Sequence, residues 1–253
     1  MITPASPEDL RIIAAQLGRI PRGVLGVAAR CGHCGENLDN GSAGHSGDIS
    51  AGDPGGISAG HPADNPVGYP GDNSVDYLTD VPAGQADGVT AGQGGDVPAG
   101  HPAVIASAPR LPGGEPFPTF YYLTCPAAVA AVSHLEANGV MREAEALLQA
   151  NPQTAAAYTR AHELYIRQRT QAGEAAGIGE VPEIAGVSAG GMPDRVKCFH
   201  ALLGHALAAG RGVNPIGDWV LDRLAELPVG DPHRWTPATC AWRSDETVGE
   251  RGR

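Results

Sequence analysis

The sequence has few aromatic residues, no long apolar run and no basic segment, and each absence excludes a class of protein. Aromatic residues make up 5% of the 253 residues, while 42% are hydrophobic, which is enough for one hydrophobic core. No stretch approaches the roughly 18 apolar residues of a membrane span, so we predict no membrane partner. The formal net charge is −11 and no basic cluster is present, so we also predict no nucleic-acid partner.

The acidity belongs largely to one segment, residues 41–102, which contains eight aspartates and no lysine, arginine or glutamate. This segment is a degenerate repeat whose units open with variants of Ser-Ala-Gly-His, and it has few large apolar side chains. A segment of this composition cannot bury enough apolar surface to fold, so we predict a long disordered insertion. Three histidines recur within it, and we attribute them to the repeat, with a weak metal-binding segment as the alternative: His45, His61 and His101.

The remaining residues form one predicted domain in two parts, 1–40 and 103–242, followed by a flexible tail over 243–253. Alternating apolar residues and flanking turn residues predict short strands, which are 24–30, 104–106 and 119–124. Apolar spacing, capping residues and prolines at first helical positions predict helices, which are 7–17, 126–138, 141–150, 153–172, 194–209 and 216–227. This order predicts an α+β fold in which a small antiparallel sheet of N-terminal strands is packed with a C-terminal helical cluster.

The five cysteines suggest a metal site more than a disulfide framework. Residues 1–20 lack the pattern of a secretory signal, so we predict a cytoplasmic protein with reduced thiols. Cys31 and Cys34 form a Cys-x-x-Cys turn, which supplies half of a tetrahedral zinc site. The missing ligands could be Cys198 with His205, which lie on one predicted helical stripe, or Cys125 at a strand-to-helix junction. The alternative is that all of these cysteines are free or buried thiols.

A second candidate site is the loop at Gly190 and Gly191, which precedes a predicted helix with Pro193 at its first position. Arg195 and Lys197 fall in the first two turns of that helix. Free backbone N–H groups and two cations at a helix start predict a pocket for an anionic small molecule. The alternative is a tight turn into a core helix with solvated charges.

Four separated segments resemble the DUF501 family, which is common in actinobacteria. They are 17–23, 116–126, 161–165 and 188–200 continued by 212–218, and they occur in the order that the family shows. The resemblance covers most of the chain outside the insertion and implies a cytosolic protein without an established activity. In the family, neighbouring genes encode enolase, a septum-formation initiator and an exopolyphosphatase, which implies a link to cell division or polyphosphate.

Three functions are consistent with these residues. The first is a binding or regulatory module with a cysteine/histidine metal site and the anion pocket. The second is a hydrolase of a phosphorylated substrate, with Arg195 and Lys197 holding phosphate and His162 or His200 as acid–base. The third is an adaptor for a protein partner in cell division. The hydrolase hypothesis requires His162, Arg195 and Lys197 to share one pocket, and the adaptor hypothesis requires a large exposed apolar patch.

Overall fold

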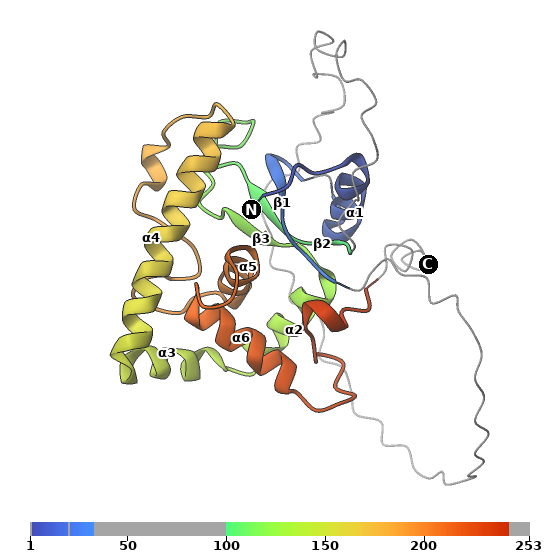
Figure 1. Ribbon diagram of the computed structural model, residues 1–253, viewed down its shortest axis with the longest axis vertical. Helices are drawn as coiled ribbons and strands as arrows, with labels where there is room; N and C mark the ends of the chain where they lie inside the picture. Colours follow the sequence, from blue (N-terminus) through green and yellow to red (C-terminus); the bar gives the residue numbers. More distant parts are fainter. Residues whose placement is uncertain (1, 20, 33–99, 243–253) are drawn as a thin grey trace, which may run out of the picture. The chain divides into compact units, whose positions relative to one another are not determined.

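A three-stranded antiparallel sheet forms the centre of the computed structural model, which describes residues 2–19, 21–32 and 100–242 (Figure 1). Its strands are β1 (Val24–Arg30), β2 (Pro102–Ser107) and β3 (Tyr121–Leu123), in the spatial order β1-β2-β3. The helices follow the sheet in the sequence, apart from the first, so the predicted α+β class is confirmed. The predicted insertion lies outside the described residues except at its end, where Gly100 to Pro102 belong to the fold and Pro102 begins β2.

The two faces of the sheet bury different helices, because successive residues of a strand point to opposite sides. On one face, Ile105 and Val27 contact Ile13 of α1 (Pro7–Leu17). On the other face, Val104 and Leu123 join the main core together with α5 (Phe199–Ala209). The sheet therefore has a helix on each side, and α5 is the buried one, with most of its residues shielded from solvent.

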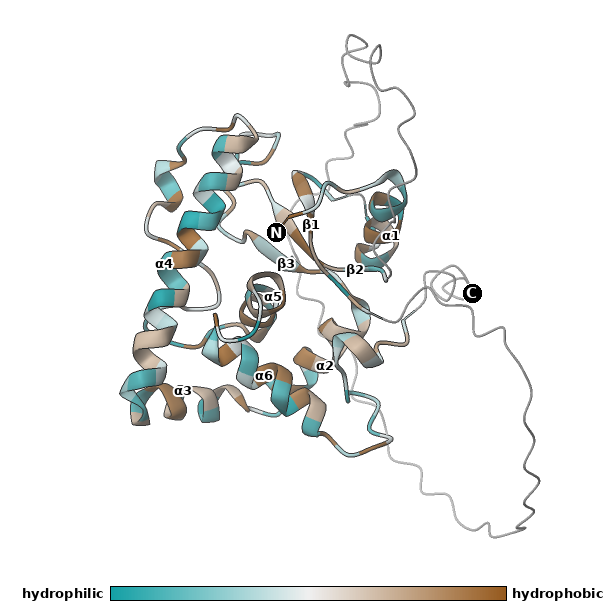
Figure 2. Ribbon diagram, in the orientation of Figure 1, coloured by the Kyte–Doolittle hydropathy of each residue, from teal (hydrophilic) through white to brown (hydrophobic). Residues whose placement is uncertain are grey.

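The other helices surround α5 and start where the sequence predicts. They are α2 (Pro126–Ala137), α3 (Met141–Ala150), α4 (Pro152–Ala175) and α6 (Pro215–Glu226), with short 3-10 turns η1 (Pro182–Ile184) and η2 (Pro237–Thr239). Asn151 and Asn214 cap α4 and α6 by accepting backbone N–H bonds, and a proline follows each of them. Figure 2 shows hydrophilic and hydrophobic residues mixed along α4 and α6, as expected for helices with one face in solvent.

A buried ion pair fixes α1 to the end of β1. Arg30 donates from Nη1 to Asp9 Oδ1 at 2.7 Å and from Nη2 to Asp9 Oδ2 at 2.8 Å. Burial alone would raise the pKa of the Asp9 carboxyl, but hydrogen bonds from Arg30 and Ser6 outweigh it and hold that pKa below its usual value. Arg30 Nη1 also donates to the Gly100 carbonyl at 3.1 Å, so the same side chain ties β1 to the residues before β2.

One predicted helix start is wrong. The residues from Pro193 to Lys197 form turns and loop, and α5 begins at Phe199. The loop closes on itself, because Lys197 N–H donates to the Gly190 carbonyl at 2.7 Å and Arg195 N–H donates to the Gly191 carbonyl at 3.1 Å. Both glycines have positive φ, 69° and 96°, which favours this compact loop over a helical turn.

Candidate metal centre

Three metal-binding side chains meet at one end of the sheet as a consequence of its antiparallel order. Cys31 follows the last residue of β1, His101 precedes the first residue of β2, and Cys125 follows β3 after one residue. In an antiparallel sheet, the end of one strand lies beside the start of its neighbour. Backbone bonds fix this junction: Cys31 N–H donates to the His101 carbonyl at 3.0 Å, and Thr124 N–H donates to the Ala103 carbonyl at 2.9 Å.

The C-terminal segment adds a fourth side chain, Cys240. Thr236 and Thr239 form a capping box around η2, so the turn before Cys240 is locally fixed. Gly32 N–H donates to the Pro237 carbonyl at 2.9 Å, which attaches this segment to the residue after Cys31. We refer to Cys31, His101, Cys125 and Cys240 together as the buried centre.

The distances among His101, Cys125 and Cys240 are close to the edges of a tetrahedron around one metal ion, and the Cys31 sulfur lies within 4.8 Å of the other three ligand atoms. The distances are 3.3 Å from His101 Nε2 to Cys125 Sγ, 3.5 Å from Cys125 Sγ to Cys240 Sγ and 3.9 Å from Cys240 Sγ to His101 Nε2. All four ligand atoms lie within 4.8 Å of one another. With zinc–sulfur bonds of about 2.3 Å and zinc–nitrogen bonds of about 2.0 Å, a tetrahedral ion requires about 3.8 Å between sulfurs and about 3.6 Å between sulfur and nitrogen. No disulfide joins the cysteines that the structure describes.

The buried centre is closed to solvent. The exposed fractions are 0% for Cys31 and Cys125, 2% for Cys240 and 4% for His101. The Trp242 ring contacts the His101 ring edge-on, with the centroids 4.9 Å apart. His101 Nδ1 is buried and has no hydrogen-bond partner within the described chain, so Nε2 is the nitrogen that faces the sulfurs. Four buried ligands without an open position are typical of a structural zinc site.

The close packing of the three thiols shifts their pKa values in opposite directions. Hydrogen bonds from Cys125 and then Cys31 lower the pKa of the Cys240 thiol far below its usual value. The hydrogen bond to Cys240 raises the pKa of Cys125 to about 12, and hydrogen bonds to Cys125 and Cys240 raise that of Cys31 still further. Removing a second and third proton would place like charges side by side in a buried space. A divalent cation cancels that repulsion, and thiolates are the form of cysteine that it binds.

The structure brings together two of the metal ligands expected from the sequence and places two others elsewhere. Cys31 and Cys125 come together as expected, whereas Cys34 lies outside the described residues. Cys198 precedes α5 and lies near His200, with 3.9 Å between Sγ and Nδ1. The predicted stripe of Cys198 and His205 is therefore wrong, because the helix starts after Cys198.

His205 is a core residue and not a metal ligand of the buried centre. Its ring stacks on Tyr121, with centroids 5.7 Å apart, and meets Tyr165 edge-on. Asn214 Nδ2 lies 3.2 Å from His205 Nδ1, so the neutral imidazole accepts a hydrogen bond there. Burial lowers the pKa of His205 to about 4, which keeps this ring uncharged at neutral pH.

Sequence reasoning missed two members of the buried centre, His101 and Cys240. Ala99-Gly100-His101 matches the repeat, so His101 was assigned to the insertion, although it directly precedes an apolar run. Cys240 follows the helices and lies near a polar terminus, without a second cysteine beside it. The signal available for His101 was the apolar strand that follows it, since residues next to a buried strand are themselves often buried.

The helix start expected beside Gly190 and Gly191 lies elsewhere, and this removes the basis of the predicted anion pocket. Arg195 and Lys197 sit in the loop before α5, and both are exposed. The N–H groups near α5 already have carboxylate partners within the protein. Phe199 N–H donates to Glu136 Oε1 at 2.6 Å, and Val196 N–H donates to Glu145 Oε1 at 3.3 Å. Binding of an anion by Arg195 and Lys197 stays an untested prediction.

The two candidate acid–base histidines lie in different surroundings. His162 of α4 has its Nδ1 2.9 Å from Ser188 Oγ. His200 of α5 has its Nδ1 3.2 Å from Glu136 Oε1. Neither of the two described cavities is lined by His162, Arg195 or Lys197, so the structure gives no support to the shared pocket that the hydrolase hypothesis requires.

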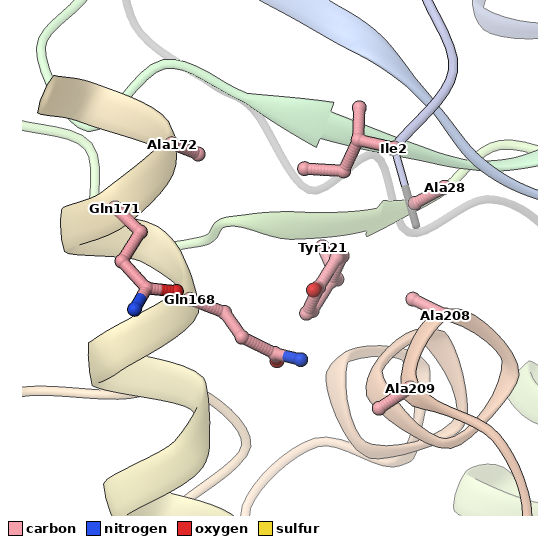
Figure 3. Close-up of a pocket in the computed structure, with 8 residues that line it drawn as sticks. All are labelled: Ile2, Ala28, Tyr121, Gln168, Gln171, Ala172, Ala208 and Ala209. Atoms are coloured by element: carbon pink, nitrogen blue, oxygen red, sulfur yellow. The ribbon is translucent and has the colours of Figure 1, made fainter. Parts of the chain in front are cut away.

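One cavity of about 320 Å³ opens between the sheet, α4 and α5 (Figure 3). Its polar groups come from Tyr121, Gln168 and Gln171, and its other lining residues are Ile2 and small alanines. Gln168 Oε1 is buried and has no hydrogen-bond partner in the described chain. The lining carries no ionisable carboxylate, lysine or arginine, so the cavity suits a small uncharged ligand. A second cavity, of about 310 Å³, is lined by residues of α4 and of the loop containing η1.

The fold and the buried centre define a small α+β protein with a four-ligand cysteine/histidine site. Residues 96–222, half of the chain, match the model of the family described as protein of unknown function (DUF501), and the chain belongs to this family. The matched region contains His101 and Cys125, while Cys31 and Cys240 lie outside it. No protein of curated function and no solved structure matches the chain. None of the described helices combines the length and apolar character needed to cross a bilayer.

Proposed function

We propose that this DUF501 protein is a binding module whose fold is closed by one zinc ion in the buried centre. The observation that carries the proposal is the arrangement of three sulfurs and one imidazole nitrogen, all buried and all within 4.8 Å of one another. Soft thiolates with one imidazole in a tetrahedral arrangement favour Zn²⁺ over hard cations such as Mg²⁺ or Ca²⁺. Because no coordination position reaches solvent, the ion acts on the fold and not on a substrate.

The ion would link parts of the chain that are distant in sequence. His101 and Cys240 are 139 residues apart, and Cys125 and Cys240 are 115 residues apart. Cys31 and His101 also lie on either side of residues 33–99, so one ion would hold both ends of that segment. Closing loops of this length carries a large entropic cost in the unfolded chain, which metal coordination offsets. This gives a physical reason why a long insertion at this place can be tolerated.

Metal removal tests this part of the proposal. A strong chelator, added under reducing conditions, is expected to lower the melting temperature by at least about 10 °C, because zinc binding contributes folding free energy directly. Adding back zinc should restore the melting temperature, while magnesium should not. Differential scanning calorimetry measures both steps. An unchanged melting curve in chelator, from protein shown by elemental analysis to be free of metal, would contradict a structural role.

The cavity of Figure 3 is the ligand site that supports a binding role. Uncharged probes with amide-like N–H donors, such as free nucleobases and acetamide, should shift the NMR signals of the Gln168 side-chain amide and the Tyr121 ring. Inorganic phosphate should leave these signals unchanged, because no cation lines the cavity. Gln168→Leu keeps the approximate size of the side chain and should abolish the shift of the Tyr121 ring signals. Shifts caused by phosphate and by none of the uncharged probes would contradict this ligand class.

A further inference from the structure

A second cluster of metal-binding side chains lies apart from the buried centre. Glu136 near the end of α2, Cys198 before α5 and His200 in the first turn of α5 place their ligand atoms within 4.8 Å of one another. All three side chains are partly exposed. We refer to these three residues as the outer site. None of them belongs to the buried centre, and neither described cavity uses them.

The distances within the outer site match three corners of a tetrahedron. His200 Nδ1 lies 3.2 Å from Glu136 Oε1 and 3.9 Å from Cys198 Sγ. A tetrahedral zinc ion requires about 3.4 Å between a nitrogen and an oxygen ligand and about 3.6 Å between nitrogen and sulfur. His200 Nδ1 is thus the common neighbour of the other two ligand atoms, and small side-chain rotations would bring all three to bonding distance of one ion.

The other ring nitrogen of His200 is held as in a ligating histidine. Nε2 lies 3.3 Å from the Val129 carbonyl and 3.2 Å from Ser133 Oγ. A backbone carbonyl can only accept, so Nε2 carries a proton and donates it. A metal-bound histidine commonly donates its second N–H to a carbonyl in this way, which fixes the ring and directs the other nitrogen at the ion.

Glu136 is also fixed in place. It accepts the Phe199 N–H at 2.6 Å, and this contact ties the carboxylate to the start of α5. The carboxylate therefore cannot move away from Cys198 and His200 without losing a helix-capping hydrogen bond. The two helices that carry the outer site pack against each other, so its geometry does not depend on exposed loops alone.

A serine–histidine–glutamate relay is the competing interpretation, since Ser133 Oγ and Glu136 Oε1 lie near opposite nitrogens of His200. It requires a neutral imidazole that can accept a proton from serine. Burial alone would lower the pKa of His200, but hydrogen bonds with Cys198 and Glu136 outweigh it and raise that pKa to about 10. The geometry argues against the relay directly, because Nε2 donates its proton to the Val129 carbonyl and so cannot accept one from Ser133.

We propose that Glu136, Cys198 and His200 form a second divalent-metal site of the zinc class, with three protein ligands and a fourth position open to water. Three protein ligands with an accessible fourth position are the arrangement in which zinc binds and polarises water or a small ligand atom. The outer site does not rest on the proposed function of the buried centre. The two sites share no residue, so one proposal can be contradicted while the other stands.

Metal stoichiometry tests the outer site. After equilibration with zinc and removal of the excess, the wild-type protein should contain about two zinc ions per chain by elemental analysis, one in each site. Cys198→Ser and His200→Gln should each retain about one, with a native circular dichroism spectrum, because the buried centre keeps its four ligands. Glu136→Gln preserves an acceptor for the Phe199 N–H and should weaken zinc binding about tenfold or more. His134→Gln, on the same helix but outside the outer site, is the matched control and should retain both ions.

The outcomes separate the two sites. If the wild type and the Cys198→Ser and His200→Gln variants contain the same amount of zinc, the outer site is wrong, whatever the buried centre holds. If the wild type contains one ion that Cys198→Ser removes and Cys240→Ser does not, the outer site stands and the proposed function fails. Loss of zinc from His134→Gln as well would also contradict the assigned ligands.

Alkylation of the wild-type protein gives a second test that needs no variant to fold. Among the described cysteines, Cys198 is the one that is not fully buried. Zinc should slow its modification by iodoacetamide about tenfold or more, as followed by peptide mass spectrometry, because the alkylating agent attacks the free thiolate. In His200→Gln the protection should disappear. Equal rates of Cys198 modification with and without zinc in the wild type would overturn the proposal.

Discussion

Cys240→Ser is expected to release the zinc ion of the buried centre and to lower the free energy of unfolding by about 3 kcal/mol or more. A serine hydroxyl is a poor zinc ligand, so three ligands remain and the buried site gains an open position. The segment that carries Cys240 would also lose its connection to the sheet through the metal ion. Equilibrium denaturation and elemental analysis of the same sample measure the two effects together.

The same chemical change at Cys198 is the matched control. Cys198 lies outside the buried centre, so Cys198→Ser should keep that ion and change the free energy of unfolding by no more than about 1 kcal/mol. Equal stability and equal metal content in the two serine variants would show that Cys240 is not a ligand. Destabilisation of Cys240→Ser without loss of metal would show that the thiol acts through packing alone.

Gly100→Ala is the second substitution with a large expected effect, although it changes no ligand. Gly100 has φ of 99°, and a Cβ atom there would lie 1.6 Å from the Cys31 carbonyl oxygen. The substitution must therefore move the backbone that places His101 beside Cys31. We expect a loss of about 3 kcal/mol or more in the free energy of unfolding and a fall in zinc affinity of at least about tenfold.

Gly32→Ala tests whether this effect is specific. Gly32 directly follows Cys31, but a Cβ atom there would meet nothing within 4 Å, and its φ is not in the left-handed region. This variant should retain zinc and near wild-type stability. If both alanine variants bind zinc as tightly as the wild type in a competition titration with a chromogenic chelator, the backbone junction at Gly100 does not position the ligands.

Much of the fold follows from local sequence signals. The strand at Val24–Arg30 and the helices at Pro7–Leu17 and Met141–Ala150 have the predicted bounds, and the starts of three other helices follow from a proline or a capping asparagine. These signals act within a few residues, so they do not depend on the rest of the chain. The one wrongly predicted helix start, at Pro193, shows that such local signals do not always decide where a helix begins.

At Pro193 the tertiary structure overrides the local signal. Gly190 packs so closely on Leu202 of α5 that a Cβ atom would lie 2.5 Å from the leucine side chain. Of the N–H groups that a helix starting at Pro193 would leave free, that of Arg195 is bonded within the loop and that of Val196 is bonded to Glu145 of α3. Glu136 of α2 accepts the N–H of Phe199. A carboxylate contributed by another helix, 63 residues away in the sequence, cannot be identified from the residues around Pro193.

For a similar reason, only two of the four residues in the candidate metal centre could be predicted from the sequence. Cys31 and Cys125 stand beside predicted strands, so their type and position suggested ligands. His101 and Cys240 become ligands only because the antiparallel sheet joins the ends of β1 and β2 and because the C-terminal segment returns to the same place. Such long-range contacts depend on topology, and the residues around Cys240 contain no signal for them.

X-ray absorption at the zinc edge tests the central claim most directly. The Cys198→Ser protein is the best sample, because any ion that it retains should occupy the buried centre. We predict about three sulfur neighbours at about 2.3 Å and one nitrogen neighbour at about 2.0 Å. Protein that retains no metal, or an ion surrounded mainly by oxygen, would contradict the account of a fold closed by Cys31, His101, Cys125 and Cys240.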